Sequence, residues 1–159
     1  MDFHEFARAK TLSLRRTAYL LCGDWHLAED LVQTALMKLY RAWSRVADSP
    51  AVDNYARQVL LRCWLDEQRK PWRRRENRDG VVPDRSQVDA PAGISETLLK
   101  ALLSLAPKQR AVVVLRYCMD LSIAEVATVL KCSEGTVKSQ ASRGLEALRE
   151  LVGQLERSL

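Results

Sequence analysis

The chain has few residues that interrupt regular structure, with only six glycines and five prolines among its 159 residues. Long stretches without such a residue favour an all-helical protein. No stretch approaches 18 consecutive apolar residues, and the first residues form no apolar signal segment. We therefore expect a soluble, cytoplasmic protein that does not insert into membranes.

Groups of residues that hold metals or carry out catalysis are missing as well. The four cysteines are scattered, form no CxxC pair and lie apart from both histidines, which argues against a zinc site or a disulfide framework. We expect four reduced cysteines: Cys22, Cys63, Cys118 and Cys132. The sequence also has no nucleophile–base pair and no glycine-rich phosphate loop. It predicts no cofactor, no metal, no catalytic residue and a protein that is not an enzyme.

What the chain does contain is enough apolar sequence for a core and an excess of positive charge. Its residues are 47% hydrophobic and 28% charged, so the chain as a whole is expected to fold. Its 159 residues suit one ordinary domain or two small ones. The net charge of +5 favours a polyanionic partner.

The most informative stretch runs from Leu121 to Leu148 and reads LSIAEVATVLKCSEGTVKSQASRGLEAL. Ser122 can cap a first short helix, and Glu125 three residues later completes a capping box. The periodicity then breaks, and Ser133 is placed to cap a second helix. Two short helices joined by a tight turn are typical of a DNA-binding helix-turn-helix, although the pattern also fits two helices of a plain bundle.

In the second of these helices, apolar and polar residues occupy opposite sides. The apolar side consists of Val137, Ala141, Leu145 and Leu148. The outer face is small, polar or basic and consists of Thr136, Lys138, Ser139, Ser142 and Arg143. Such a face suits the major groove, where hydroxyls bond phosphates or base edges and arginine can form two hydrogen bonds to guanine. The alternative is a solvated face without DNA contact.

The first half of the chain is predicted to form three helices. Gly23-Asp24 ends the first, and Asp24 can cap a second that continues to about Ser44. Residues 46–54, VADSPAVDN, are predicted to be a polar turn. A third helix is expected over residues 55–70.

Basic residues then lead into a stretch without apolar periodicity. Trp72-Arg73-Arg74-Arg75 fits nucleic-acid contact or a solvated charge run. Residues 76–95 are rich in Asp, Arg, Pro and Gly and are predicted to be a linker. A leucine-rich helix should follow from Glu96, and Pro107 suits the first position of the next helix. The β-branched run after Pro107 is also compatible with a strand, but the start signal and the helical neighbours favour a helix.

Several segments resemble bacterial sigma-70-type factors, most closely the small extracytoplasmic-function (ECF) sigma factors and an actinobacterial-like subgroup among them. These segments are RRTAYLLCGDWHLAEDLVQ, LAEDLVQTALMKLYRAW and LAPKQRAVVVLRYCMDLSIAEVATVLKCSEGTVKSQASRGLEALREL. The resemblance covers the chain from about Phe3 to Leu151. It implies an all-α fold of two small helical domains joined by a flexible linker, the second a four-helix domain that contains the helix-turn-helix. The implied boundaries are 1–75, 76–95 and 96–159.

The resemblance also implies a function. A chain of this family is a promoter-specificity subunit of RNA polymerase, which recognises −35 and −10 elements and stabilises melted promoter DNA. Its implied partners are double-stranded and melted promoter DNA and the RNA polymerase core, through the clamp helices of the largest subunit and the flap of the second-largest. An anti-sigma factor is a further expected partner.

Three sets of site residues follow from the resemblance. The polymerase-binding set is Glu29, Asp30, Leu31, Gln33, Leu36 and Tyr40. The set for the −10 element is Asp48, Ser49, Asn54, Tyr55, Arg57, Arg62 and Arg69. The set for the −35 element is Thr136, Lys138, Ser139, Gln140, Ser142 and Arg143, with Gln140 where the family commonly has an arginine. The main alternative is a stand-alone helix-turn-helix regulator, which binding to core polymerase would distinguish; an enzyme acting on nucleic acid is disfavoured by the missing catalytic groups.

Overall fold

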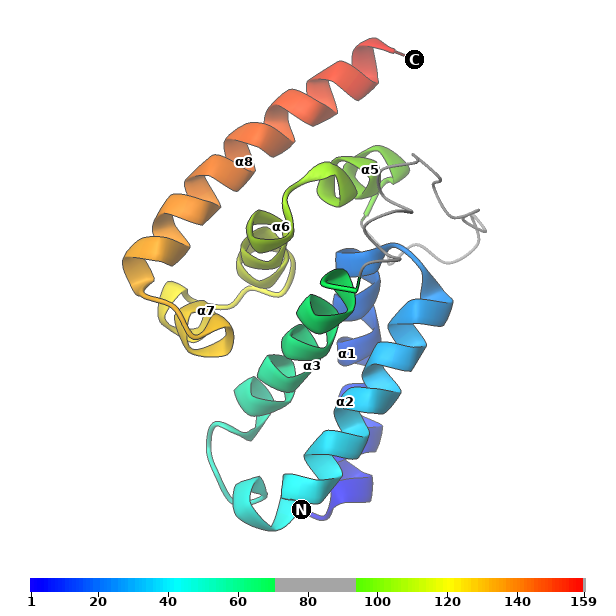
Figure 1. The fold of residues 1–159 in the computed structure, drawn as a ribbon, viewed down its shortest axis with the longest axis vertical. Helices are drawn as coiled ribbons and strands as arrows, with labels where there is room; N and C mark the ends of the chain where they lie inside the picture. Colours follow the sequence, from blue (N-terminus) through cyan, green and yellow to red (C-terminus); the bar gives the residue numbers. More distant parts are fainter. Residues whose placement is uncertain (71–93, 159) are drawn as a thin grey trace.

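The computed structural model describes residues 1–70 and 94–158, and these residues form helices and turns without a strand. The first half contains α1 (Phe3–Cys22), α2 (Trp25–Val46) and α3 (Val52–Gln68). The helices α1 and α2 are antiparallel neighbours joined by a tight turn (Figure 1). Over the described residues, the predicted all-helical class is confirmed.

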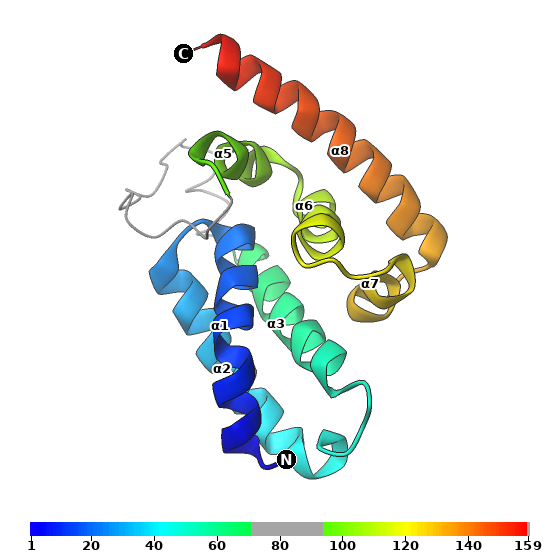
Figure 2. The same cartoon turned by 180° about the vertical axis from the view of Figure 1, so that it is seen from behind.

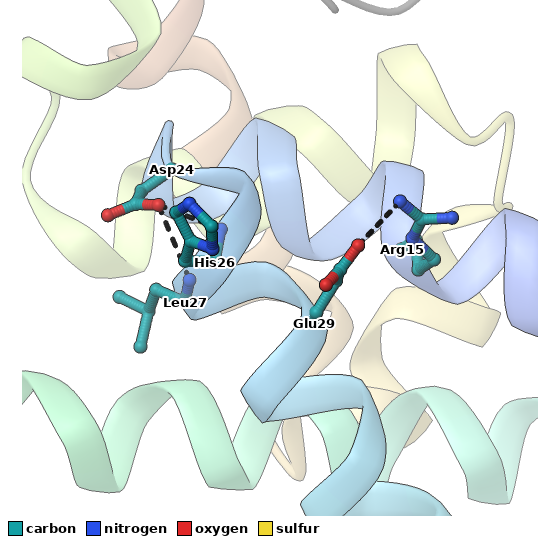
Figure 3. Close-up of polar contacts among 5 residues, drawn as sticks. All are labelled: Arg15, Asp24, His26, Leu27 and Glu29. Carbon is teal, nitrogen blue, oxygen red and sulfur yellow. Dashed lines mark hydrogen bonds and ion pairs between the residues drawn. The ribbon is translucent and has the colours of Figure 1, made fainter. Parts of the chain in front are cut away.

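The turn between α1 and α2 follows from two local signals. Gly23 ends α1 with φ of 74°, a left-handed conformation that glycine adopts without steric cost. Asp24 caps α2, because its Oδ1 accepts hydrogen bonds from the backbone N–H groups of His26 at 2.8 Å and Leu27 at 3.4 Å (Figure 3). Both the predicted stop and the predicted cap are confirmed.

The turn between α2 and α3 is shorter than the sequence predicted. The prediction covered residues 46–54, whereas the structure confines the turn to residues 47–51. Pro50 restricts only itself and the residue before it, so the chain can enter a helix soon afterwards. The acidic side chain of Asp53 suits the first turn of that helix. As a result Asn54 lies in α3 and not in the turn.

The second half contains four α-helices among its described residues. They are α5 (Glu96–Ser104), α6 (Pro107–Val113), α7 (Ile123–Leu130) and α8 (Glu134–Arg157). A short π-helical segment, η2 (Val114–Cys118), continues α6. The helix predicted over the β-branched run after Pro107 is therefore confirmed, but its π-helical turn had no signal in the sequence pattern.

The basic run 72–75 and residues 76–93 of the predicted linker lie outside the described residues. None of the helices in residues 1–70 and 94–158 combines the length and the apolarity that crossing a membrane requires.

The two halves pack against each other. In both views α3 lies between the α1–α2 pair and the second half, where its neighbours are α6 and α7 (Figures 1 and 2). Helix α1 contacts α5 and η2. Buried apolar side chains of both halves form one continuous cluster, which includes Leu20, Leu60, Trp64, Leu102 and Val114. The sequence analysis made no prediction of this arrangement.

Candidate nucleic-acid interface

The helix-turn-helix consists of two capped helices, α7 and α8. At the start of α7 the backbone N–H of Glu125 donates to Ser122 Oγ at 3.1 Å, and the N–H of Ser122 donates to Glu125 Oε1 at 3.0 Å. This confirms the predicted capping box. The hydrogen bonds from Ser122 lower the pKa of the Glu125 carboxyl, because they stabilise its charged form. Lys131, with φ of 54°, ends α7 in the left-handed conformation and turns the chain toward α8.

Helix α8 presents the predicted polar face to solvent. It begins at Ser133, whose Oγ accepts a hydrogen bond from the backbone N–H of Thr136 at 3.0 Å. All the residues predicted to contact the −35 element are exposed except Gln140, which is partly buried. Four of them recur at helical spacing on one side and define an outer stripe of Thr136, Ser139, Gln140 and Arg143. Another side of the helix is buried against α6 and α7 through Val137, Ala141 and Gly144.

This outer face combines positive charge with hydroxyl groups. Lys138 and Arg143 supply the charges. The Ser139 hydroxyl donates to the backbone carbonyl of Thr136 at 3.1 Å, and Thr136 Oγ1 lies 2.9 Å from Ser133 Oγ. Hydroxyls bonded in this way within their own helix can rotate toward a phosphate or a base edge. The N-terminal end of α8 adds the partial positive charge of the helix dipole.

The residues predicted to contact the −10 element form a strip and not a single cluster. Its members along the chain are Asp48, Ser49, Asn54, Tyr55, Arg57, Arg62 and Arg69. The first two lie in the 47–51 turn, the next three are half-buried on the early turns of α3, and Arg62 and Arg69 are exposed. Within the strip, Arg57 Nη1 donates to Asn54 Oδ1 at 2.9 Å. At 1.5 Å of rise per residue, Arg69 lies about 22 Å from Asn54 along the helix axis.

The residues predicted to bind polymerase occupy the first part of α2. The exposed members are Glu29, Asp30, Gln33 and Tyr40, and Leu36 is partly buried. Leu31 faces the core, because it falls on the same side of the helix as the buried Ala28 and Ala35. A side chain in that position supports the surface from within and does not reach its outside.

One of the exposed carboxylates is paired with α1. Glu29 Oε1 accepts a hydrogen bond from Arg15 Nη2 at 2.8 Å (Figure 3). The Arg15 guanidinium also lies 5.4 Å from the centre of the Trp25 ring, and that ring stacks on Tyr19 at 4.0 Å. Because both charged side chains are more than one-third exposed, the pair orients the start of α2 and adds little stability.

An exposed apolar pair on α2 was missed by the sequence reasoning. Met37 is 61% exposed and Tyr40, one turn later, is 64% exposed. Two large apolar side chains side by side on the surface are typical of a protein–protein contact. The signal in the sequence was that Met37 falls outside the apolar stripe of the helix. It also lies one turn before Tyr40, which was already assigned to the polymerase-binding set.

The thiols and acidic residues form no centre of their own in the described parts of the chain. None of the four cysteines forms a disulfide bond, and burial raises the pKa of the Cys63 and Cys118 thiols. Within residues 1–70 and 94–158, no group of three or more His, Cys, Asp or Glu side chains could hold a metal ion.

Comparison with known families identifies the class of protein. Residues 11–74 match the family model for Sigma-70 region 2, and residues 95–148 match the model for Sigma-70, region 4. The two matches together cover most of the chain. The chain therefore belongs to the sigma-70 family, the promoter-specificity subunits of RNA polymerase. A stand-alone regulator, the main alternative from the sequence, does not account for a sigma-70 region 2 in the first half.

Individual relatives place the chain among the ECF sigma factors. It is 38% identical to the RNA polymerase sigma-E factor of Streptomyces avermitilis, over 94% of this chain and 84% of that protein. It is 31% identical to the ECF RNA polymerase sigma factor SigW of Bacillus subtilis, over 83% of this chain and 79% of SigW. The sigma factor RpoE of Bartonella quintana, solved in complex with the anti-sigma factor NepR, superimposes with a TM-score of 0.76 at 28% identity, over 94% of this chain and 97% of RpoE.

Proposed function

We propose that this chain binds core RNA polymerase through the outer face of α2, captures melted −10 DNA along α3 and docks α8 in the major groove of the −35 element. The observation that carries the proposal is the exposed polar and basic face of a capped α8, held on a helix-turn-helix whose other side is buried. The proposed domains are residues 1–75 and 96–159 with a linker at 76–95. The family matches at 11–74 and 95–148 support this division.

Each DNA-reading surface suits a different form of DNA. On α8, the exposed Arg143 can form two hydrogen bonds to a guanine edge, while the exposed Lys138, nearer the start of the helix and on another side of it, suits a phosphate. Along α3, the exposed Arg62 and Arg69 can follow the backbone of a single strand. The 47–51 turn at the end of that strip is the proposed place for an unstacked base, whose capture offsets the cost of melting.

The proposed polymerase surface is the exposed part of α2, and the clamp helices of the largest subunit are its proposed target. The flap of the second-largest subunit is proposed to contact the second half. In this scheme the chain carries out no chemical step, because the core enzyme makes the RNA. The cytoplasm is the proposed location, since the work is done on RNA polymerase at promoters.

An anti-sigma factor is a further proposed partner. The support is the likeness, over almost the whole of both chains, to RpoE in its complex with NepR. A pull-down from the native host that recovers polymerase together with a small inhibitor would support this partner. Recovery of polymerase alone would count against it.

Run-off transcription with purified core polymerase on a randomised promoter library tests the main proposal. With the chain present, we expect start sites to be selected next to shared −35 and −10 sequences. Core polymerase alone is the control and should show no such selection. A library transcribed identically with and without the chain would reject the proposal.

A further inference from the structure

Arg110 of α6 connects the two halves of the molecule from a buried position. Its Nη1 donates to the backbone carbonyl of Leu21, at the end of α1, at 2.6 Å. Its Nη2 donates to the carbonyls of Leu103 at 3.0 Å and Leu105 at 2.9 Å, at the end of α5. The guanidinium carbon also lies 5.5 Å from the ring centre of the fully buried Trp64 of α3. We call the contacts of Arg110 with Leu21 and Trp64 the Arg110 bridge.

The bridge holds the charged guanidinium of Arg110 in a buried position, away from the water that would normally hydrate it. Burial lowers the pKa of Arg110 to about 10, because the charged form loses its hydration. Its three hydrogen-bond acceptors are neutral carbonyls and not a carboxylate. The cost of burying the charge is offset by charge-assisted hydrogen bonds and by the face of Trp64. Separation of the halves would remove the Leu21 and Trp64 contacts and let water reach the guanidinium.

Two further contacts show that the halves fit closely. A Cβ atom added at Gly23 would lie 2.6 Å from Leu103 Cδ1, so that a side chain at residue 23 would force Leu103 of α5 to shift. The hydroxyl oxygen of the buried Thr17 on α1 lies 2.6 Å from the sulfur of Met119. The two halves are therefore closely packed against each other around the Arg110 bridge.

This packing covers one DNA-reading surface and leaves the other open. Helix α7 packs against α3, and the Glu125 carboxylate interacts with Asn54 and Arg57 of the proposed −10 strip, which further lowers its pKa. A negative charge thus stands next to two side chains that are proposed to bind a nucleic acid. On α8, by contrast, Thr136, Lys138, Ser139, Ser142 and Arg143 remain exposed to solvent.

We propose that the described conformation is an autoinhibited state held closed by the Arg110 bridge, in which α7 covers Asn54 and Arg57 until the two halves separate. The inference rests on the proposed −10 function of α3. If the open form is a minor state, the apparent affinity for single-stranded DNA is reduced by its population. Separation of the halves is then a required step before −10 DNA is captured.

Arg110 also has a plainer role, since its bonds to Leu103 and Leu105 close the end of α5 within its own half. A variant that disturbs only the contact between the halves separates the two roles. Leu103→Asp does so, because this partly exposed side chain faces Gly23 and an aspartate there would be repelled by the carbonyls at the end of α1. Ser104→Asp is the matched control, since it adds the same charge at the exposed neighbouring position.

The test uses the full chain with two measurements. Small-angle X-ray scattering reports the radius of gyration, and fluorescence anisotropy reports binding of a labelled single-stranded oligonucleotide of about 20 nucleotides and mixed sequence. We expect the Leu103→Asp and Arg110→Gln chains to have a larger radius of gyration and to bind the oligonucleotide about tenfold more tightly than the unchanged chain. A tenfold gain corresponds to an open form that makes up about one-tenth of the unchanged chain. Ser104→Asp should match the unchanged chain in both, and circular dichroism should show the same helix content in every variant.

The two proposals can fail separately. An unchanged radius of gyration in Arg110→Gln would overturn the role of the bridge in holding the two halves together. An extended Leu103→Asp chain with unchanged DNA affinity would overturn the inhibitory role. Arg62→Ala, added to the opened chain, tests the DNA surface itself, because Arg62 is exposed already in the closed form. If that change leaves tight binding intact, the α3 strip is not the surface that binds and the proposed −10 function is wrong.

Discussion

Gly144 of α8 lies directly against Val113 of α6. A Cβ atom placed on Gly144 would come within 2.7 Å of Val113 Cγ2 and 3.5 Å of the carbonyl oxygen of Gln109. Helix α8 therefore approaches α6 at this point more closely than a residue with a side chain would allow. Valine cannot easily rotate away, because its branched side chain has few open rotamers in a helix.

The first prediction compares two glycines of α8. Gly144→Ala should lower the free energy of unfolding by about 1–3 kcal/mol, because the added methyl group overpacks a filled site. Gly135→Ala should raise it by about 0.5–1 kcal/mol, since Gly135 is exposed and only Ser133 Oγ, at 3.8 Å, lies near the new atom. Urea unfolding followed by circular dichroism measures both. Equal effects of the two changes would mean that α8 is not held against α6 in this way.

The second prediction concerns the apolar pair on α2. Met37→Ser should weaken binding to core polymerase by about 1–2 kcal/mol, since an exposed apolar side chain at the centre of a contact commonly carries that much. Leu12→Ser is the control, because Leu12 is 75% exposed on the neighbouring helix α1 and lies outside the proposed surface. Competition with a labelled sigma factor for core polymerase measures the effect. A larger loss from Leu12→Ser would place the polymerase surface on α1.

The third prediction concerns the groove face of α8. Arg143→Ala should cost about 1–3 kcal/mol in binding to duplexes that carry the −35 sequence selected in the transcription library, the value of a good bidentate contact. Arg149→Ala is the control, because Arg149 is exposed on the same helix but points about 120° away from Arg143. Anisotropy titrations at one fixed salt concentration compare the two. Comparable losses of affinity in the two variants would indicate electrostatic attraction to the DNA backbone without specific contacts to bases in the groove.

The fourth prediction concerns pH. The pKa of Glu125 lies below its ordinary value of 4.5 in the fold, because Ser122 donates to the carboxylate. A lowered carboxyl pKa stabilises the fold above the unfolded value and loses that contribution as pH falls through the folded pKa. Glu125→Gln should therefore be less stable than the unchanged chain at neutral pH, and the difference should shrink as the pH falls below 4.5.

Thermal unfolding over this pH range measures that difference. Ser122→Ala serves as the comparison, since it removes the cap hydroxyl and leaves the titrating group in place. Part of its effect should persist at acid pH, because the hydrogen bond that Ser122 Oγ accepts from the Glu125 N–H does not depend on the charge of the carboxyl. A difference between Glu125→Gln and the unchanged chain that stays constant with pH would show that the carboxylate does not contribute through its charge.

The sequence predicted well those features that depend on residues within one or two turns. The caps at Asp24, Ser122 and Ser133 are side-chain hydrogen bonds to nearby backbone groups, so their residue types were enough to place the helix starts. The exposed face of α8 with Ser139, Ser142 and Arg143 followed from helical spacing alone. The error over residues 46–54 arose where no side chain marks the boundary, since Ala51 makes no capping hydrogen bond at the start of α3.

The sequence by itself thus determined the helical class, the capped helix-turn-helix and the family, because each depends on local order along the chain. Only the tertiary structure decided that Arg110 is buried between the two halves and that α7 packs against α3. Burial is a sum over contacts from elements far apart in sequence, so a polar run such as PKQR reads as a solvated face until α1 and α3 are packed onto it.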